Sequence, residues 1–278
     1  MKLEQKIEKK IERTLSKVKL FKKKTILVAL SGGKDSATTA YMFRKLGYKI
    51  EGFHIDLGMG DYSKRCLSAV VKLCEILEIP LYIYDIKNEM GSSMCYLRTS
   101  IQKKHFEKQR GEIKNCAICG VIKKWILNKR ARELGFEIIA TGHNLDDEAQ
   151  TFLMNVLKGA PELSANTGVV TKNILNKKFI PRVKPLFYID EDEIRKFTLE
   201  KKLPVVYEGC PCLIDSYRKQ VREWIYKNLT TRDKENLIKN FEKLQSRMKS
   251  IKSSELVYCE ICGEPSRGGV CKKCKLFT

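Results

Sequence analysis

Residues 26–36 read Ile-Leu-Val-Ala-Leu-Ser-Gly-Gly-Lys-Asp-Ser, an apolar run that leads directly into a glycine-rich turn. The five apolar residues have the length and branching of a buried strand, and the apolar spacing that follows, from Ala40 to Leu46, suits a helix. Two glycines at such a turn let successive N–H groups face one concavity, and the helix N-terminus adds its positive dipole end. We therefore predict a phosphate-binding turn, with a plain serine-capped Gly-Gly turn as the alternative. The predicted phosphate-binding residues are Ser31, Gly32, Gly33, Lys34, Asp35 and Ser36.

The sequence SGGKDS at residues 31–36 resembles the signature of the N-type ATP pyrophosphatases. The resemblance implies that ATP is split into AMP and pyrophosphate while a substrate oxygen is adenylated. A strand before the motif and a helix after it are the flanks that this interpretation requires.

The chain carries a large surplus of positive charge, with 54 lysines and arginines against 33 aspartates and glutamates and a net charge of +21 over 278 residues. Such a surplus attracts polyanions by releasing their counterions, so nucleic acid or an anionic membrane surface is the expected partner class. A lysine-rich host is the competing explanation of the charge. No apolar run has the length that spans a bilayer, and we expect a cytoplasmic protein.

From residue 26 to about residue 183 the pattern alternates between strand and helix, which predicts an α/β fold with a doubly wound, parallel, five-stranded sheet. Residues 159–178 have little periodicity and are interpreted as a long loop. The predicted strands are residues 26–30, 50–56, 81–86, 136–141 and 179–183.

Composition divides the chain into four predicted regions: an amphipathic helix (1–22), a nucleotide-binding domain (23–188), a basic helical region (189–254) and a cysteine-rich tail (255–278). The first helix is expected to dock on the body or on a partner subunit, with a membrane surface as the alternative. We interpret the basic helices as nucleic-acid contacts, although a solvated face is the ordinary explanation for each lysine.

Polar residues follow two of the predicted strands. Asp56 ends the second strand beside the glycine-rich turn, where it suits binding the adenosine part of ATP. His54 lies on the same face of that strand, and we interpret it either as a residue that binds the nucleotide or as a packed core histidine. Gly142 follows the fourth strand, level with the turn. Asp146 and Asp147 come next, and a helix cap explains one or two of these acids. We favour magnesium or proton chemistry for Asp147 and leave Asp146 open.

Eleven cysteines in a reducing compartment favour metal binding or catalysis over disulfides. Cys116 and Cys119 open a helical segment and share one face with Lys123, and the helix N-terminus and the cation both favour thiolate. The pair alone suits a redox couple. With Cys210 added, three thiolates suit an iron–sulfur cluster with one open iron, or a persulfide relay.

The last twenty residues contain two Cys-x-x-Cys pairs separated by eight residues that include three glycines. Four thiolates at this spacing predict a zinc ribbon, which cannot fold without its metal. Its expected role is structural, with a grip on RNA as a second role. The predicted zinc ligands are Cys259, Cys262, Cys271 and Cys274.

Five motifs occur in one order: SGGKDS, HIDLG at 54–58, CAIC at 116–119 with Lys123, ATGHNLDDEAQT at 140–151, and EGCP at 208–211. Together they resemble the tRNA 2-thiolation enzymes of the TtcA/TtuA type, from about Lys24 to the C-terminus. The resemblance implies an adenine nucleotide alpha hydrolase fold. It also implies an enzyme that uses ATP and Mg²⁺ to replace the C2 oxygen of a tRNA pyrimidine by sulfur, and uridine is the favoured pyrimidine. The implied partners are tRNA and a sulfur donor, which is sulfide, a persulfide or a carrier protein; a homodimer is left open.

The resemblance also implies a role for individual residues. It places a [4Fe-4S] cluster on Cys116, Cys119 and Cys210, catalysis at Asp147 with Lys123 nearby, and ATP at the SGGKDS turn. The further ATP-binding residues that it implies are His54, Asp56 and Gly142.

Two features depart from the family pattern. Many relatives of the TtuA kind begin with a cysteine-rich finger, whereas this chain begins with a lysine-rich helix. Cys212 is an additional thiol with three possible roles: it binds the open iron, it replaces Cys210 as a ligand, or it forms a sulfur bridge.

The alternative functions are another adenylating ligase acting on tRNA, such as a lysidine synthase, and a zinc-ribbon RNA-binding or redox protein without ATP chemistry.

Overall fold

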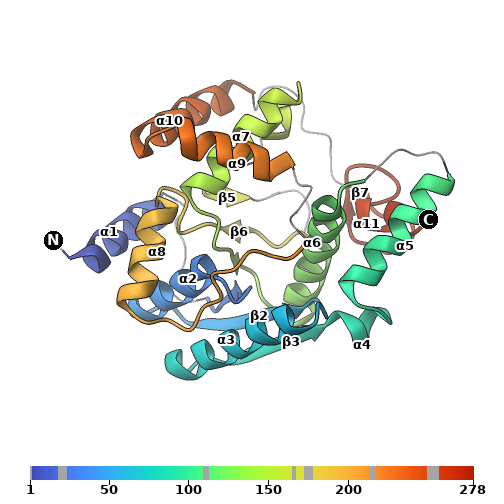
Figure 1. The fold of residues 1–278 in the computed structure, drawn as a ribbon, viewed down its shortest axis with the longest axis horizontal. Coiled ribbons are helices and arrows are strands. Elements are labelled where there is room, and N and C mark those ends of the chain that lie inside the picture. Colours follow the sequence, from blue (N-terminus) through green and yellow to red (C-terminus); the bar gives the residue numbers. More distant parts are fainter. Residues whose placement is uncertain are drawn as a thin grey trace.

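A six-stranded sheet with strand order β3-β2-β1-β4-β6-β5 forms the centre of the molecule (Figure 1). The computed structural model describes residues 2–17, 24–108, 113–164, 167–171, 178–212, 217–248 and 257–278. Neighbouring strands from β3 to β6 pair in parallel, which confirms the predicted five-stranded parallel sheet. The strands are β1 (Ile26–Ala29), β2 (Ile50–Asp56), β3 (Leu81–Asp85), β4 (Ile139–Ala140), β5 (Val170–Thr171) and β6 (Arg182–Val183).

The sixth strand, β5, corrects the interpretation of residues 159–178 as a loop. The 3₁₀ helix η1 (Pro161–Ser164) and β5 both lie in this segment, and β5 pairs antiparallel with β6 at the edge of the sheet. A two-residue strand is too short to show a period of two, so its pairing partner rather than its own pattern specifies it. Residues 165, 166 and 172–177 lie outside the described residues.

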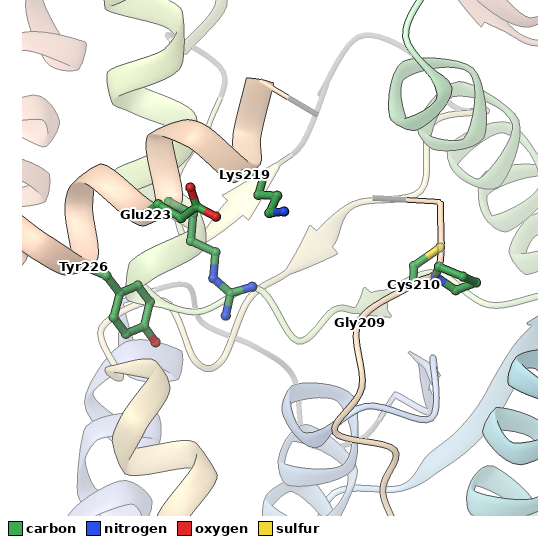
Figure 2. Close-up of a pocket in the computed structure, with 7 residues that line it drawn as sticks. Gly209, Cys210, Lys219, Glu223 and Tyr226 are labelled. Atoms are coloured by element: carbon green, nitrogen blue, oxygen red, sulfur yellow. The ribbon is translucent and has the colours of Figure 1, made fainter. Parts of the chain in front are cut away.

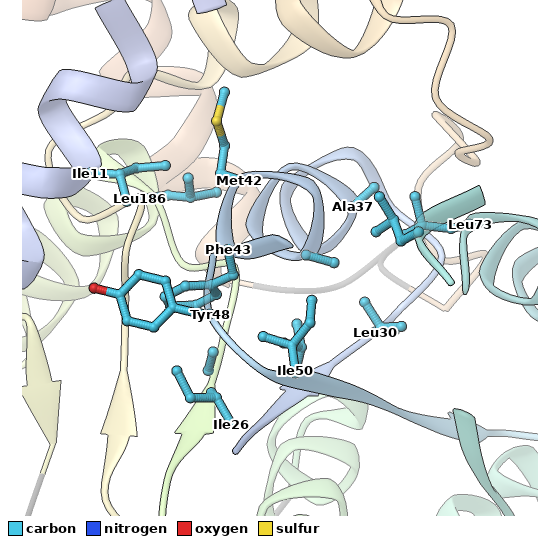
Figure 3. Packing of buried hydrophobic residues seen from close by; sticks show 14 of the residues in the cluster. Ile11, Ile26, Leu30, Ala37, Met42, Phe43, Tyr48, Ile50, Leu73 and Leu186 are labelled. Carbon is cyan, nitrogen blue, oxygen red and sulfur yellow. The ribbon is translucent and has the colours of Figure 1, made fainter. Parts of the chain in front are cut away.

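Strand β1 separates two layers of helices because its side chains alternate between the faces of the sheet. Ile26, Val28 and Leu30 pack in one buried cluster, and Leu27 packs in the other. Figure 3 shows the first cluster, in which Phe43 of the following helix lies toward the strands and Met42 points to the opposite side, toward Ile11. All-round burial of β1 explains its uninterrupted apolar sequence.

Four helices cover the first face: α1 (Leu3–Ser16), α2 (Lys34–Lys45), α3 (Asp61–Leu77) and α8 (Glu191–Glu200). Ile7 and Ile11 of α1 are fully buried in this layer, so the amphipathic helix docks on the body of the protein, one of the two expected arrangements. A salt bridge of 2.7 Å from Lys10 to Glu193 ties α1 to α8.

Four helices supply the second face: α4 (Ile86–Met90), α5 (Met94–Glu107), α6 (Asn115–Glu133) and α11 (Lys272–Phe277). Helix α11 belongs to the cysteine-rich tail, which also contains the hairpin β7 (Val257–Tyr258) and β8 (Pro265–Ser266). Buried Leu276 of α11 joins the core beneath α6, and Asn128 of α6 donates to Glu264 at 3.2 Å. The tail is therefore packed against the sheet domain.

The remaining helices α7 (Leu145–Leu157), α9 (Tyr217–Asn228) and α10 (Thr231–Met248) pack together beyond the end of the sheet (Figure 1). Val221 and Ile225 of α9 are buried against Ala149 of α7, and the rings of Phe152 and Phe241 lie 4.3 Å apart. Among the described residues, no helix combines the length and apolarity needed to cross a membrane.

Candidate active site

The SGGKDS turn joins β1 to α2, as the sequence predicts. Gly32 has a φ of +85°, and a Cβ there would lie 2.8 Å from the Cα of Cys66, so both the backbone conformation and the space require glycine. The Ser36 hydroxyl accepts from the Ser31 N–H at 3.2 Å and donates to the Gly33 carbonyl at 2.9 Å. These bonds shape a tight turn at the N-terminus of α2, where backbone N–H groups favour an anion.

Gly142 lies against this turn, as expected from the meeting of parallel strand ends. A Cβ on Gly142 would be 2.7 Å from the carbonyl carbon of Asp35 and 2.8 Å from the nitrogen of Ser36. Only glycine therefore lets the segment after β4 approach the start of α2 so closely.

Two carboxylates stand beside the turn. Asn144 caps α7 by accepting from the Asp147 N–H at 2.9 Å, and its amide donates to the Asp35 carboxylate at 2.8 Å. Burial raises the pKa of Asp147, and burial together with the charge of Asp147 raises the pKa of Asp35. Asp147 thus forms the predicted cap and also lies close to Asp35, in a place where carboxylate oxygens suit a divalent cation.

Glu191, which the sequence analysis did not single out, organises the cations of this site. Its carboxylate accepts from Lys34 of the turn at 2.8 Å, from Arg222 of α9 at 2.7 Å and from Tyr226 at 3.1 Å. Lys34 also binds Asp35 at 2.9 Å. The only local signal for Glu191 is the acidic start of α8, which an ordinary helix cap explains equally well.

Asp146 has a structural role. Its carboxylate accepts from the Glu191 N–H at 2.8 Å and from Lys234 at 2.6 Å, and the same ammonium binds Asp190 at 2.6 Å. All three charged side chains are buried. This network holds α7, α8 and α10 together behind the site.

We expect Lys234→Ala to lower the free energy of unfolding by about 3–5 kcal/mol, because two buried carboxylates lose their shared cation. Urea denaturation followed by circular dichroism measures the change. Lys239→Ala is the matched control, since the Lys239–Glu235 pair on the same helix is exposed and worth only about 0.3–0.5 kcal/mol. Equal losses in the two variants would contradict the structural role of the network.

His54 and Asp56 lie near the end of β2. The His54 ring is buried, and its Nδ1 is 2.8 Å from the carbonyl oxygen of Leu30, next to the turn. Its buried Nε2 has no hydrogen-bond partner among the residues described, and burial lowers the pKa of the ring. The Asp56 carboxylate accepts from the Gly58 N–H at 2.9 Å.

The mid-chain cysteines are brought only partly together. Cys116 is exposed at the first turn of α6, and Cys119 is half-buried one turn later. Burial raises the pKa of Cys210, nearby Cys119 raises it further, and Lys123 opposes the rise, so these groups are neighbours. In the described part of the chain, Cys116, Cys119 and Cys210 do not form a group with all sulfurs within 4.8 Å of one another. A four-iron cluster holds its ligands farther apart than one ion does, so this spacing leaves the donor set compatible with a cluster.

Arg98 and Cys95 of α5 adjoin this group, and the sequence analysis singled out neither of them as part of a site. The buried Arg98 guanidinium donates to Cys212 at 2.8 Å and to Cys95 at 3.2 Å. Cys212 therefore lies beside α5, in contact with a cation. An isolated arginine in a helix has no sequence signature that would predict this contact.

A cavity of about 520 Å³ lies between the segment that contains Cys210 and helix α9 (Figure 2). Cys210 lies on one wall, and side chains of α9 form the opposite wall, including Arg222, which binds Glu191 and through it Lys34. The SGGKDS turn does not line this cavity, and it is linked to it through the ion pairs of Glu191 with Arg222 and Lys34. The lining residues are Gly209, Cys210, Pro211, Lys219, Arg222, Glu223 and Tyr226.

The terminal cysteines form a tight group. The ligand atoms of Cys259, Cys262, Cys271 and Cys274 all lie within 4.8 Å of one another, and the sulfurs of Cys262 and Cys271 are 3.6 Å apart. Sulfurs bound tetrahedrally at about 2.3 Å from a zinc ion are about 3.8 Å apart. The four thiols thus match a site for one tetrahedral metal ion.

A family model described as the PP-loop domain matches residues 3–229. The chain belongs to the PP-loop family. The tRNA-5-methyluridine(54) 2-sulfurtransferase of Pyrococcus horikoshii is 36% identical over 97% of this chain and 84% of its own. The enzyme of the same name from Thermus thermophilus is 33% identical over 91% of this chain and 76% of its own.

One solved structure extends the comparison with this PP-loop protein. The U34-tRNA thiolase NcsA from Methanococcus maripaludis, described with its [4Fe-4S] cluster, is 26% identical, with a TM-score of 0.77 over 99% of this chain and 87% of its own. The tRNA 2-thiolation protein NcsA of Haloferax volcanii is 30% identical over 91% of this chain and 81% of its own. These relatives are tRNA 2-thiolation enzymes, which confirms the resemblance inferred from the motifs.

Proposed function

We propose that this PP-loop protein is an ATP-dependent tRNA 2-sulfurtransferase that adenylates the C2 oxygen of a tRNA pyrimidine, uridine being favoured, and replaces it by sulfur. The observation that carries the proposal is a cavity with Cys210 on one wall and, on the other, Arg222, which reaches Lys34 of the PP-loop through Glu191. Thiolation needs an activated oxygen and a sulfur source at the same carbon, and this cavity lies between Cys210 and the ion pairs that lead to the PP-loop.

ATP binds at residues 31–36, with its phosphates on the N–H groups at the start of α2. The close approach of Gly142 to the turn leaves the backbone free of side chains there. His54 and Asp56 lie near the adjoining strand end, and the buried Nε2 of His54 is available to the nucleoside. The C2 oxygen of the base attacks the α-phosphorus, the bond to the β-phosphate bridging oxygen breaks, and pyrophosphate leaves.

Asp35 and Asp147 are suited to hold Mg²⁺ on the phosphates. The two carboxylates lie beside the PP-loop, and burial raises the pKa of both, although Lys34 pairs with Asp35 and Arg218 with Asp147. A bound divalent cation would favour the charged form of both carboxylates and neutralise the departing pyrophosphate. Lys34 and Arg222, held in place by Glu191, add fixed positive charge to the same side.

Cys116, Cys119 and Cys210 are suited to hold a [4Fe-4S] cluster, since two of them are neighbours and the third lies one helical turn from Cys119. Such a cluster with three protein ligands supplies an iron that is open to exogenous sulfur. Lys123 lies within electrostatic reach of Cys210 and stabilises negative charge as sulfur adds to C2. The C2–S bond forms, the C2–O bond breaks, and AMP leaves with the former C2 oxygen. The sulfur enters as sulfide, from a carrier protein, or from a persulfide whose S–S bond a second thiol then cleaves to form a disulfide.

The terminal cysteines are proposed to bind Zn²⁺ in a structural role. The tail has little core of its own, and its hairpin and α11 surround the four thiols. Metal binding therefore stabilises the fold of the tail and its packing against α6.

Anaerobic reaction of the purified protein with tRNA, ATP, Mg²⁺ and sulfide tests the proposed function. We expect one 2-thiolated pyrimidine per tRNA, detected by mass spectrometry of the digested nucleosides, with AMP and pyrophosphate formed in equal amounts. A product in which an amine replaces the oxygen would indicate a lysidine-type ligase. Absence of pyrophosphate release in the presence of tRNA would contradict adenylation altogether.

A further inference from the structure

Five cations from four structural elements gather near the end of β6, and we call them the cation cluster. The Arg182 guanidinium donates to the carbonyl oxygen of Lys124 at 3.1 Å, and Lys184 follows two residues after Arg182 on the same face of the chain. Lys184 and Arg218 bind Glu148 and Asp147, which are adjacent residues of α7. Lys272 begins α11, where the next residue, Lys273, lies over the ring of Trp125 on α6 at 4.6 Å. Helix α6, strand β6 with the residue after it, helix α9 and the tail helix α11 each contribute. The members are Lys124, Arg182, Lys184, Arg218 and Lys272.

Acidic groups neutralise only two members of the cation cluster. Lys184 binds Glu148 at 2.6 Å, and Arg218 lies 3.4 Å from Asp147. Among the described residues, no carboxylate lies within salt-bridge distance of Lys124, Arg182 or Lys272, whereas Lys184 and Arg218 each have one. The cluster therefore carries a surplus of positive charge.

Holding these cations together is unfavourable without an anion. Burial lowers the pKa of Arg182 to about 10, and its buried Nε has no partner among the described residues. Desolvation and four of the cations lower the pKa of His143, and an imidazole ring, neutral or protonated, offers no negative charge to offset them. Cationic side chains held close together lower one another's pKa, and such a group is typical of a site that binds an anionic ligand.

The position of the cation cluster indicates which anion it takes. Lys124 follows Lys123, whose charge acts on Cys210, and Arg218 contacts Asp147, so the cluster adjoins both halves of the proposed active site. Lys124 and Lys272 are exposed, which lets a large ligand reach them. The PP-loop N–H groups and Lys34 already serve the triphosphate on the other side of Asp147.

We propose that the cation cluster binds backbone phosphates of the tRNA next to the target pyrimidine and so positions that base in the cavity. This inference rests on the proposed function, because it takes tRNA as the substrate. It also gives the tail a role in RNA binding, since Lys272 precedes Lys273 of α11, which lies over the ring of Trp125, the residue after Lys124. Cationic side chains that meet phosphates fix the register of the nucleic acid without reading its sequence.

Lys124→Ala tests the proposal in the full-length protein with its metals, prepared anaerobically. We expect the Kd for a tRNA transcript to rise on the order of fivefold, uniformly across tRNA sequences, and the slope of log Kd against log salt to fall by about 0.7–0.9 for one lost phosphate contact. Adding Lys272→Ala should lower the slope again by a similar amount. The Kd for ATP should stay unchanged.

Lys64→Ala on α3 is the matched control, since Lys64 is an exposed lysine and its removal changes the net charge equally. The proposal is overturned if Lys124→Ala and Lys64→Ala change the tRNA affinity and the salt slope alike. It is also overturned if Lys124→Ala weakens ATP instead of tRNA, because the cations would then serve the triphosphate. Thiolation by the unmodified protein is measured alongside, so a protein that binds tRNA through these cations without thiolating it would count against the proposed function alone.

Discussion

Cys119→Ser is expected to abolish the iron–sulfur cluster and to lower the rate of tRNA thiolation by on the order of 10²-fold or more. Cys119 lies one helical turn after Cys116 and is a neighbour of Cys210, so it is the central member of the proposed ligand set. A serine hydroxyl is a poor substitute for thiolate toward iron. Iron and acid-labile sulfide analysis of anaerobically purified protein, with the visible absorption spectrum, measures the loss.

Cys95→Ser is the matched control for this prediction. Cys95 is a half-buried thiol that contacts Arg98 in the same region, and it is outside the proposed ligand set. We expect this variant to keep its iron, and both variants to keep the zinc proposed for the tail, because its four thiols are a separate group. A Cys119→Ser protein with a full complement of iron and a normal thiolation rate would refute the assignment of this ligand.

Asp147→Asn is expected to lower kcat by about 10²–10⁴-fold while the cluster stays bound. The substitution keeps the size of the side chain and removes the charge that is proposed to hold Mg²⁺ or accept a proton. Because burial raises the pKa of Asp147, the activity of the unmodified protein should fall as the pH drops through that raised pKa. Rates of pyrophosphate release and of thiolation, measured against pH and Mg²⁺ concentration, test this.

Asp192→Asn serves as the control, because Asp192 is an exposed acid in the first turn of α8. It should change kcat by less than about twofold, the scale of a surface substitution of about 0.5 kcal/mol or less. If Asp147→Asn retained normal turnover at every pH, the carboxylate would be confined to capping α7.

Local sequence was sufficient for the features that depend on neighbouring residues. The strand, the double glycine and the helix of residues 26–46 follow from periodicity and turn chemistry, and the tail cysteines follow from their spacing. Gly142 was also correctly placed beside the turn, because the carboxyl ends of adjacent parallel strands meet at one edge. The capping of α7 by Asn144 and Asp147 was also predicted, because a helix cap depends on residues three positions apart in the sequence.

Long-range packing decided the rest. Glu191 lies 157 residues after Lys34, and Arg98 lies 114 residues before Cys212, so nothing in either neighbourhood marks these pairs. The cation cluster likewise joins residues of α6, β6, α9 and α11. A charged side chain on a helix looks the same in sequence whether it meets solvent or a distant partner, because only the folded chain determines how far it is removed from water and which charges surround it.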